Sequence, residues 1–168
     1  LINIYKAAEL VVFAIVGYGI CIPLAYFTPK RNTVVFIPRF KDSYSGNVKE
    51  LFVYADNTLQ NDQPSGGGSP AQAIYLCESG ALYRQLREKR NIIRYPSFRS
   101  FGILLRTRLI VVEGNEWVDR FKYHLLFYAQ KVQLWHGSGM KKIGKMKPKV
   151  ANETLSYRLK RKIRGDNQ

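Results

Sequence analysis

A histidine followed by a glycine-containing turn and two lysines is the part of this sequence best suited to chemistry. The residues are, in order, His136, Gly137, Ser138, Gly139, Met140, Lys141 and Lys142. An imidazole titrates near neutral pH, so His136 could remove a proton from an attacking hydroxyl or donate to a phosphoryl oxygen whose charge grows in the transition state. Spacing alone also leaves a purely structural role open for this histidine.

The residues after His136 suit a bound phosphate. Gly137 and Gly139 let the backbone turn sharply and approach a ligand, while Ser138 offers a hydroxyl and would cap a following helix. Lys141 and Lys142 would then lie on the first helical turn, where positive charge opposes the helix dipole unless an anion is nearby. The segment therefore predicts a phosphate-binding turn at residues 137–142.

Short apolar segments that alternate with helical patterns must position this turn. The expected strands are residues 33–37, 73–77, 91–95, 108–112 and 129–135. The expected helices are 47–55, 79–89 and 97–106, with 116–127 partly helical and 57–70 a flexible connection. This alternation predicts an α/β fold with a Rossmann-like parallel sheet flanked by helices. No G-x-G-x-x-G follows any of the strands, so no dinucleotide site is predicted.

The polar loop after the first expected strand is a second candidate for ligand binding. It contains Ser43 and Ser45, and Asn47 follows them. In a parallel sheet this loop and His136 lie at the same edge, where ligands of open α/β sheets bind. These side chains could contact a substrate phosphate. The alternative is an ordinary polar loop in which Asn47 caps the helix that follows.

The N-terminal region predicts association with a membrane. Residues 10–27 contain no charged side chain, and Lys30 and Arg31 follow. A transmembrane helix, a shallow monotopic anchor and an uncleaved signal-like segment all fit this pattern. A buried core helix is the alternative, because the run is short for a bilayer. We therefore separate residues 1–30, a membrane-associating hydrophobic helix, from the domain at 31–144.

Charge and cysteine content narrow the class of protein. The formal net charge is +15, which indicates an anionic partner such as phospholipid, a phosphate-rich polymer, a nucleotide or nucleic acid. Much of this charge lies in residues 145–168 and the lysines before them, a basic tail or the start of a linker. Cys21 and Cys77 have neither zinc-ligand spacing nor a disulfide pattern, so no metal site is predicted.

Residues 133–144, QLWHGSGMKKIG, resemble the Q-x-W-H-G-T-P-L-K-K-I-G motif of the CDP-glycerol glycerophosphotransferases, which build teichoic-acid-type polymers in bacteria. Upstream, residues 43–52, SYSGNVKELF, resemble the polar loop of the family and its N-x-K-x-L-(F/Y) helix. The likeness extends from about residue 10 to residue 144. The W-H-G-x-x-x-K-K-I-G run is the specific part of it, whereas the apolar segment and the strands are weak evidence by themselves.

The resemblance implies the N-terminal, acceptor-side half of a two-domain GT-B arrangement at the cytoplasmic face of the cell membrane. It implies transfer of polyol phosphate from CDP-glycerol, or a related CDP-polyol, to a lipid-linked polyol-phosphate acceptor, with release of CMP. His136 occupies the position of the motif histidine of the family. No further cofactor and no nucleic acid is implied.

Two departures from the family pattern bear on activity. Ser138, Gly139 and Met140 replace Thr-Pro-Leu, which keeps the hydroxyl and loosens the turn. The donor-binding half of the family and its second functional histidine are not recognised in this sequence, so we expect them to come from further residues or another chain. The alternatives are a catalytically silent, membrane-bound scaffold of the same fold and, less favoured, a basic nucleic-acid-binding module.

Overall fold

The computed structural model describes residues 8, 11–41, 43–61, 70–88, 90–119 and 121–134. At its centre lies a parallel five-stranded sheet of strand order β3-β2-β1-β4-β5. The strands are β1 (Arg31–Ile37), β2 (Gln72–Cys77), β3 (Ile92–Arg94), β4 (Thr107–Val112) and β5 (Gln130–Gln133). The predicted α/β class and Rossmann-like parallel sheet are confirmed, and each expected strand overlaps an observed one.

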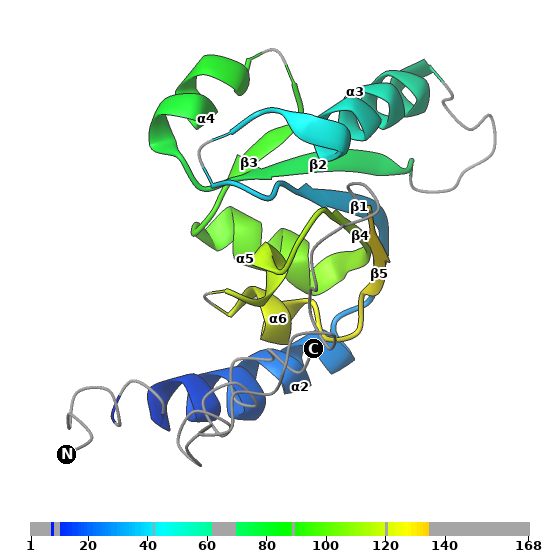
Figure 1. The fold of residues 1–168 in the computed structure, drawn as a ribbon. Helices are drawn as coiled ribbons and strands as arrows, with labels where there is room; N and C mark the ends of the chain where they lie inside the picture. The colour runs from blue at the N-terminus through cyan, green and yellow to red at the C-terminus, as the bar shows by residue number, and fades with distance from the viewer. Residues whose placement is uncertain are drawn as a thin grey trace, which may run out of the picture.

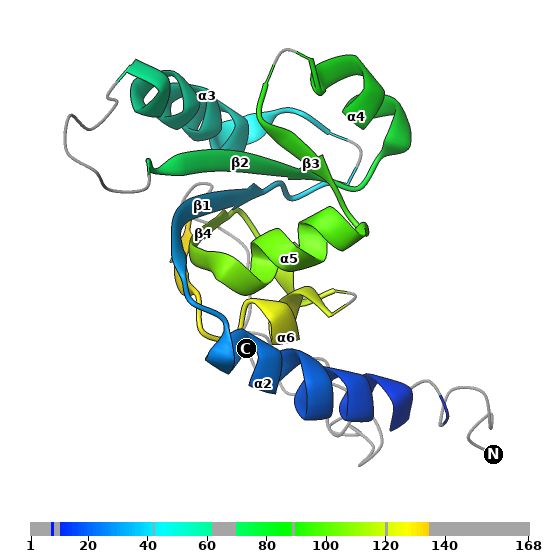
Figure 2. The ribbon, with the colours of Figure 1, turned by 180° about the vertical axis from the view of Figure 1, so that it is seen from behind.

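Helices cover both faces of this sheet (Figures 1 and 2). Helices α3 (Gly46–Asn61) and α4 (Gly80–Leu86) lie on one face, and α5 (Phe98–Arg106) and α6 (Lys122–Leu125) lie on the other. A short 3-10 helix, η2 (Glu116–Val118), precedes α6. The prediction that residues 116–127 are partly helical is therefore confirmed. Helices on both faces explain why the strands read as continuous apolar runs rather than as alternating patterns.

Two hydrophobic cores form, one on each face of the sheet. Along β1, Val35 and Ile37 enter the core beneath α5 and α6, whereas Phe36 enters the core beneath α3. All three side chains are essentially buried. This alternation follows from the two-residue period of a strand, and it leaves the ends of the strands as the places where polar chemistry can occur.

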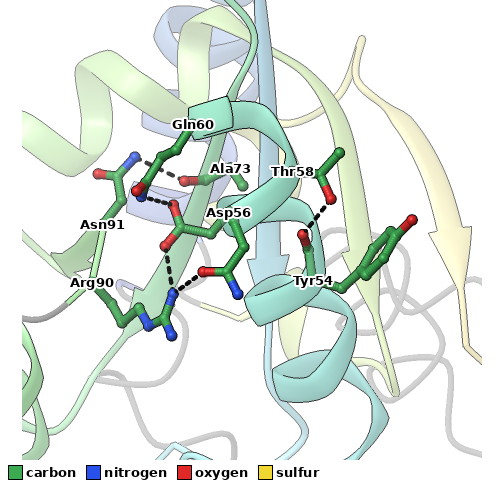
Figure 3. A network of polar contacts seen from close by, with 8 residues as sticks. Tyr54, Asp56, Thr58, Gln60, Ala73, Arg90 and Asn91 are labelled. Carbon is green, nitrogen blue, oxygen red and sulfur yellow. Dashed lines mark hydrogen bonds and ion pairs between the residues drawn. The ribbon is translucent and has the colours of Figure 1, made fainter. Parts of the chain in front are cut away.

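Helix α3 is longer than the sequence pattern indicated. Residues 57–70 were expected to be a flexible connection, but the helix continues to Asn61. Polar contacts hold its last turns (Figure 3): the buried Asp56 pairs with Arg90 at 3.4 Å and accepts from Gln60 at 3.1 Å, and Arg90 donates to Asn57 at 2.6 Å. These contacts connect the end of α3 to the segment that leads into β3. Helix propensities of neighbouring residues cannot predict contacts between residues so far apart in sequence.

A helical segment precedes β1 and lies against α6 and α5. Residues 11–14 are helical, followed by a π-helical stretch, η1 (Ile15–Cys21), and by α2 (Ile22–Phe27). Gly17, Cys21 and Ala25 are its buried residues, spaced four apart on one face. In the described part of the chain, no helix has both the length and the apolar character needed to cross a bilayer.

The contact between Gly17 and His124 fixes this helical segment to the domain. His124 is 1% exposed, and a Cβ built on Gly17 would lie 2.5 Å from its Nε2 atom. Tyr18 meets the same imidazole edge-on, with ring centroids 4.9 Å apart. His124 therefore has a structural position, and Gly17 is required because no larger residue fits.

Replacing Gly17 with alanine should destabilise the fold by about 1–3 kcal/mol, because the added methyl group overlaps a buried ring. Chemical denaturation measures this loss. Gly19→Ala is the matched control, since no atom lies within 4 Å of a Cβ at Gly19. That variant should be neutral or stabilising by up to ~1 kcal/mol through helix propensity. Equal effects of the two substitutions would contradict the packing described.

Candidate active site at the carboxyl edge of the sheet

The strand order places a topological switch point between β1 and β4. The chain leaves β1 toward α3 on one face and leaves β4 toward η2 and α6 on the other (Figure 1). In such sheets the crevice beyond the carboxyl ends of the two strands binds ligands. The loops that border this crevice follow Ile37 and Val112, and the first of them carries the predicted residues Ser43 and Ser45.

A tyrosine of β2 forms a hydrogen bond with the loop that follows β1. Tyr75 Oη donates to the backbone carbonyl of Ser43 at 3.0 Å. Burial raises the pKa of Tyr75, so its hydroxyl remains a donor throughout the physiological range. The Ser43 hydroxyl donates to the carbonyl of Phe40 at 3.3 Å. Ser43 is half-buried, whereas Ser45 and Asn47 are exposed.

A carboxylate that follows β4 occupies the N-terminus of α3. The backbone amides of Asn47 and Val48 donate to Glu113 Oε1, at 2.7 and 3.4 Å. Gly46 has φ +81°, and a Cβ there would lie 2.9 Å from the same oxygen. Glycine is therefore needed both for the backbone conformation and for the approach of the carboxylate. The contact joins the two loops that flank the switch point.

The expected N-cap is thereby corrected. Asn47 was predicted to cap the helix with its own side chain, but α3 begins at Gly46, and Asn47 lies within the first turn. Glu113, which is 66 positions away in sequence, supplies the acceptor. A carboxylate at this end also complements the helix dipole. Since Glu113 occupies two of the free amides, this helix end is already satisfied by the chain itself.

A row of four alternating charges runs from the buried interior to the surface at the carboxyl edge of the sheet. Lys122 Nζ lies 2.6 Å from Glu78 Oε1, Lys41 Nζ lies 3.7 Å from Glu78 Oε2, and Lys41 Nζ lies 3.0 Å from Asp119 Oδ2. The side chain of Lys122 is fully buried and that of Glu78 is 10% exposed, whereas Lys41 and Asp119 are 41% and 49% exposed. The row connects the carboxyl end of β2 with both crevice loops.

Lys122 is the most constrained member of this row. Burial lowers the pKa of Lys122, and its hydrogen bond with Glu78 opposes that shift. Its ammonium also lies 5.5 Å from the centre of the Tyr95 ring. The preceding residue, Phe121, has φ +67°, a conformation rare for a bulky residue and most frequent near functional sites.

The sequence did not single out Glu78, Glu113 or Lys122. A usable signal existed for the two glutamates, because each one directly follows a buried strand, as His136 was expected to do. No signal existed for Lys122, which lies in a short helix among aromatic residues. Asp119 has no partner at a defined spacing in the sequence, and the structure pairs it with Lys41.

The turn at residues 136–142 lies outside the described residues, so His136, Gly137, Ser138, Gly139, Lys141 and Lys142 remain sequence predictions. The structure does describe the strand that leads to them. β5 pairs with β4, and the Leu134 amide donates to the Val112 carbonyl at 2.7 Å. The described chain thus ends beside Val112, the residue that precedes Glu113. Across the described residues, no three His, Cys, Asp or Glu side chains gather as metal ligands.

A scan against protein families matches residues 20–166 to the family described as CDP-Glycerol:Poly(glycerophosphate) glycerophosphotransferase. The chain belongs to this glycerophosphotransferase family. Searches of curated proteins and of solved structures gave no match. The matched range includes both the loop at residues 43–47 and the turn at 136–142. A CDP-glycerol glycerophosphotransferase-type activity is therefore the general function of the chain, and the sequence-based recognition of the family is confirmed.

Proposed function

We propose that the chain forms the acceptor-side half of a GT-B-type transferase that makes teichoic-acid-like polymers at the cytoplasmic face of a bacterial cell membrane. It would pass glycerol phosphate, or another polyol phosphate, from a CDP-polyol to a lipid-linked acceptor. The family match over residues 20–166 is the observation that carries this proposal. It favours a transferase over the nucleic-acid-binding module and the silent scaffold. The donor-binding half would be supplied by further residues or by another chain.

The proposed reaction is an attack by an acceptor hydroxyl oxygen on the β-phosphorus of the CDP-polyol. A bond forms between that oxygen and the β-phosphorus, while the bond from the β-phosphorus to the bridging oxygen breaks. CMP leaves with the bridging oxygen. His136 takes the proton of the attacking hydroxyl or donates to a phosphoryl oxygen. Gly137, Ser138, Gly139, Lys141 and Lys142 would hold the phosphate whose charge grows.

The geometry of the described loops refines how an acceptor phosphate would be held. Because Glu113 occupies two of the amides at the N-terminus of α3, we expect side chains of this loop to contact an acceptor phosphate. Ser45 and Asn47 are exposed and can take this role, whereas the Ser43 hydroxyl already donates within its loop. We therefore assign Ser45 and Asn47 to direct contact and Ser43 to the shape of the loop.

The exposed residues of the N-terminal helical segment would lie on the membrane surface. Opposite its buried face the segment exposes large apolar side chains, among them Ile15 (61%), Tyr26 (66%) and Phe27 (79%). The chain carries a net charge of +15, which complements anionic lipid. An amphipathic helix with such a face lies in the plane of the interface. This arrangement corresponds to the monotopic alternative.

The test is release of CMP by the full-length product of the reading frame that encodes these residues. Vesicles carrying a glycerophosphate-primed lipid are mixed with CDP-glycerol, and CMP is measured by chromatography. We expect CMP only when donor and acceptor are both present. Absence of CMP with CDP-glycerol and with other CDP-polyols would contradict the proposal.

A variant of the same assay separates membrane binding from chemistry. Phe27→Ser should slow transfer to the vesicle-bound acceptor about tenfold, because burying a phenylalanine in an apolar phase contributes roughly 1.5–3 kcal/mol. Transfer to a soluble, short-chain acceptor should be unchanged, since Phe27 lies outside the crevice. An equal loss with both acceptors would contradict a membrane role for this residue.

A further inference from the structure

A cavity of about 210 Å³ lies between α5 and the amino ends of β1 and β2. Arg31 comes from the start of β1 and Gln72 from the start of β2, while Arg99 and Arg106 come from α5. Thr33 and Ile74, which also line the cavity, lie four and three residues before the ends of β1 and β2, which places the cavity at least ~10 Å from the carboxyl edge of the sheet. The cavity is therefore separate from the candidate active site, and a ligand bound in it would not depend on the proposed function.

Three arginine residues, each of them exposed to solvent, line this open cavity, and no acidic side chain does. Within the described ranges, Arg31, Arg99 and Arg106 form no ion pair. Three positive charges around one open hollow raise the local positive potential, which favours an anion there. Their planar donor forks match phosphate oxygens in particular, so a phosphate is the anion that suits these side chains.

The residues of α5 that line the cavity have the spacing of one helix face. Arg99, Gly102, Ile103 and Arg106 are spaced i, i+3, i+4 and i+7, so they share one side of the helix. Phe98, at the start of the helix, also lines the cavity and is 100% exposed. A fully exposed phenyl ring beside two arginines offers contact to the apolar part of a ligand whose phosphate the arginines bind.

Gly102 is an independent sign that the cavity is kept open. It lies in the middle of a nine-residue helix, where glycine is destabilising relative to alanine. Its φ is not positive, and no atom lies within 4 Å of a Cβ built on it. Neither backbone conformation nor crowding therefore requires glycine here. A larger side chain at position 102 would extend into the cavity, and glycine leaves this space open.

The cavity residue Arg31 follows the apolar helical segment closely in sequence. Arg31 lies four residues after Phe27, the last residue of α2. The Lys30 ammonium donates to the Leu105 carbonyl at 2.7 Å, which ties this connection to the last turn of α5. A phosphate-bearing ligand of a membrane surface could reach the cavity, as could a soluble one.

We propose that this arginine pocket, formed by Arg31, Arg99 and Arg106 around Gly102, is a binding site for a phosphate-ester anion. The arginines bind the phosphate and Phe98 contacts the organic part. Soluble sn-glycerol 3-phosphate and the headgroup of phosphatidylglycerol both carry a phosphate ester, and they serve as the two probes.

The decisive variant is Gly102→Leu, which fills the pocket. It should weaken binding at least tenfold while leaving the denaturation midpoint equal or higher, because leucine favours a helix more than glycine does. Binding of sn-glycerol 3-phosphate is measured by calorimetry, and binding to vesicles of phosphatidylglycerol in phosphatidylcholine by sedimentation. Loss in the calorimetric arm supports the pocket with a soluble ligand. Loss in the vesicle arm alone supports it with a lipid headgroup.

Two substitutions that each remove one positive charge distinguish binding in the pocket from nonspecific attraction to a basic protein. Arg99→Gln should weaken binding about tenfold, whereas Arg87→Gln, which removes the same charge from an exposed pair with Glu88, should change it less than twofold. Equal effects would overturn the proposal in favour of nonspecific attraction. Binding by Gly102→Leu that matches the wild type in both arms would also overturn it.

Discussion

Replacing Lys122 with methionine should cost about 3–5 kcal/mol of unfolding free energy, the usual result of removing one partner from a buried ion pair. Lys122 is fully buried and Glu78 is 10% exposed, so the substitution leaves a carboxylate in a poorly solvated place. Lys41, at 3.7 Å, is the ion-pair partner that would remain near it among the described residues. Urea denaturation of the wild type and the variant measures the difference.

The double variant Lys122→Met with Glu78→Gln keeps this prediction testable if the single variant does not fold. Removing both charges relieves the burial penalty, and the double variant should recover most of the loss. The exposed pair of Arg87 and Glu88 is the control, and Arg87→Met should cost less than about 1 kcal/mol. A Lys122→Met cost as small as that of Arg87→Met would contradict a buried, coupled pair.

Replacing His136 with alanine in the full-length protein should reduce turnover of CDP-glycerol by roughly 100-fold or more, the range that a general acid or base supplies. Gln130→Ala is the control, since it changes an exposed residue of the preceding strand outside the motif and should leave turnover near that of the wild type. Wild-type turnover by the His136→Ala protein would remove this residue from the mechanism.

The pH profile distinguishes the two roles open to His136. A general base must be neutral, so turnover should fall below about pH 6.5, the ordinary pKa of histidine. A positively charged donor to the phosphoryl oxygen must be protonated, so turnover should instead fall above that pH. Either limb should be absent from the residual activity of His136→Ala. His124, the other histidine of the chain, is buried against Gly17.

The sheet was predictable because its signal is local. Residues 33–37 and 108–112 are short β-branched runs, and burial on both faces makes such runs continuous. Helix α3 was predicted too short because its last turns depend on Arg90, which pairs with Asp56 from 34 positions away. Helix propensity depends only on residues that are close in sequence. Without the contact to Arg90, the composition of residues 57–61 therefore indicates a loop.

The candidate site was predictable to the extent that it lies on strand ends. Ser43, Ser45 and Asn47 were placed at the carboxyl edge by the topology of parallel strands, and the structure has them there. The contacts of Glu113 with α3 and of Lys122 with Glu78 join residues 44 or more positions apart. Such pairs are set by the packing of the elements, which one sequence does not reveal.

The most direct test of the transfer chemistry is ³¹P NMR of the full-length protein acting on CDP-glycerol and a glycerophosphate-primed lipid acceptor. Attack at the β-phosphorus predicts that the two diphosphate resonances disappear together. Two signals should replace them in equal amounts, one from the monoester CMP and one from a new phosphodiester on the acceptor. Glycerol phosphate in solution, or CDP-glycerol that persists in the presence of acceptor, would contradict the proposed function.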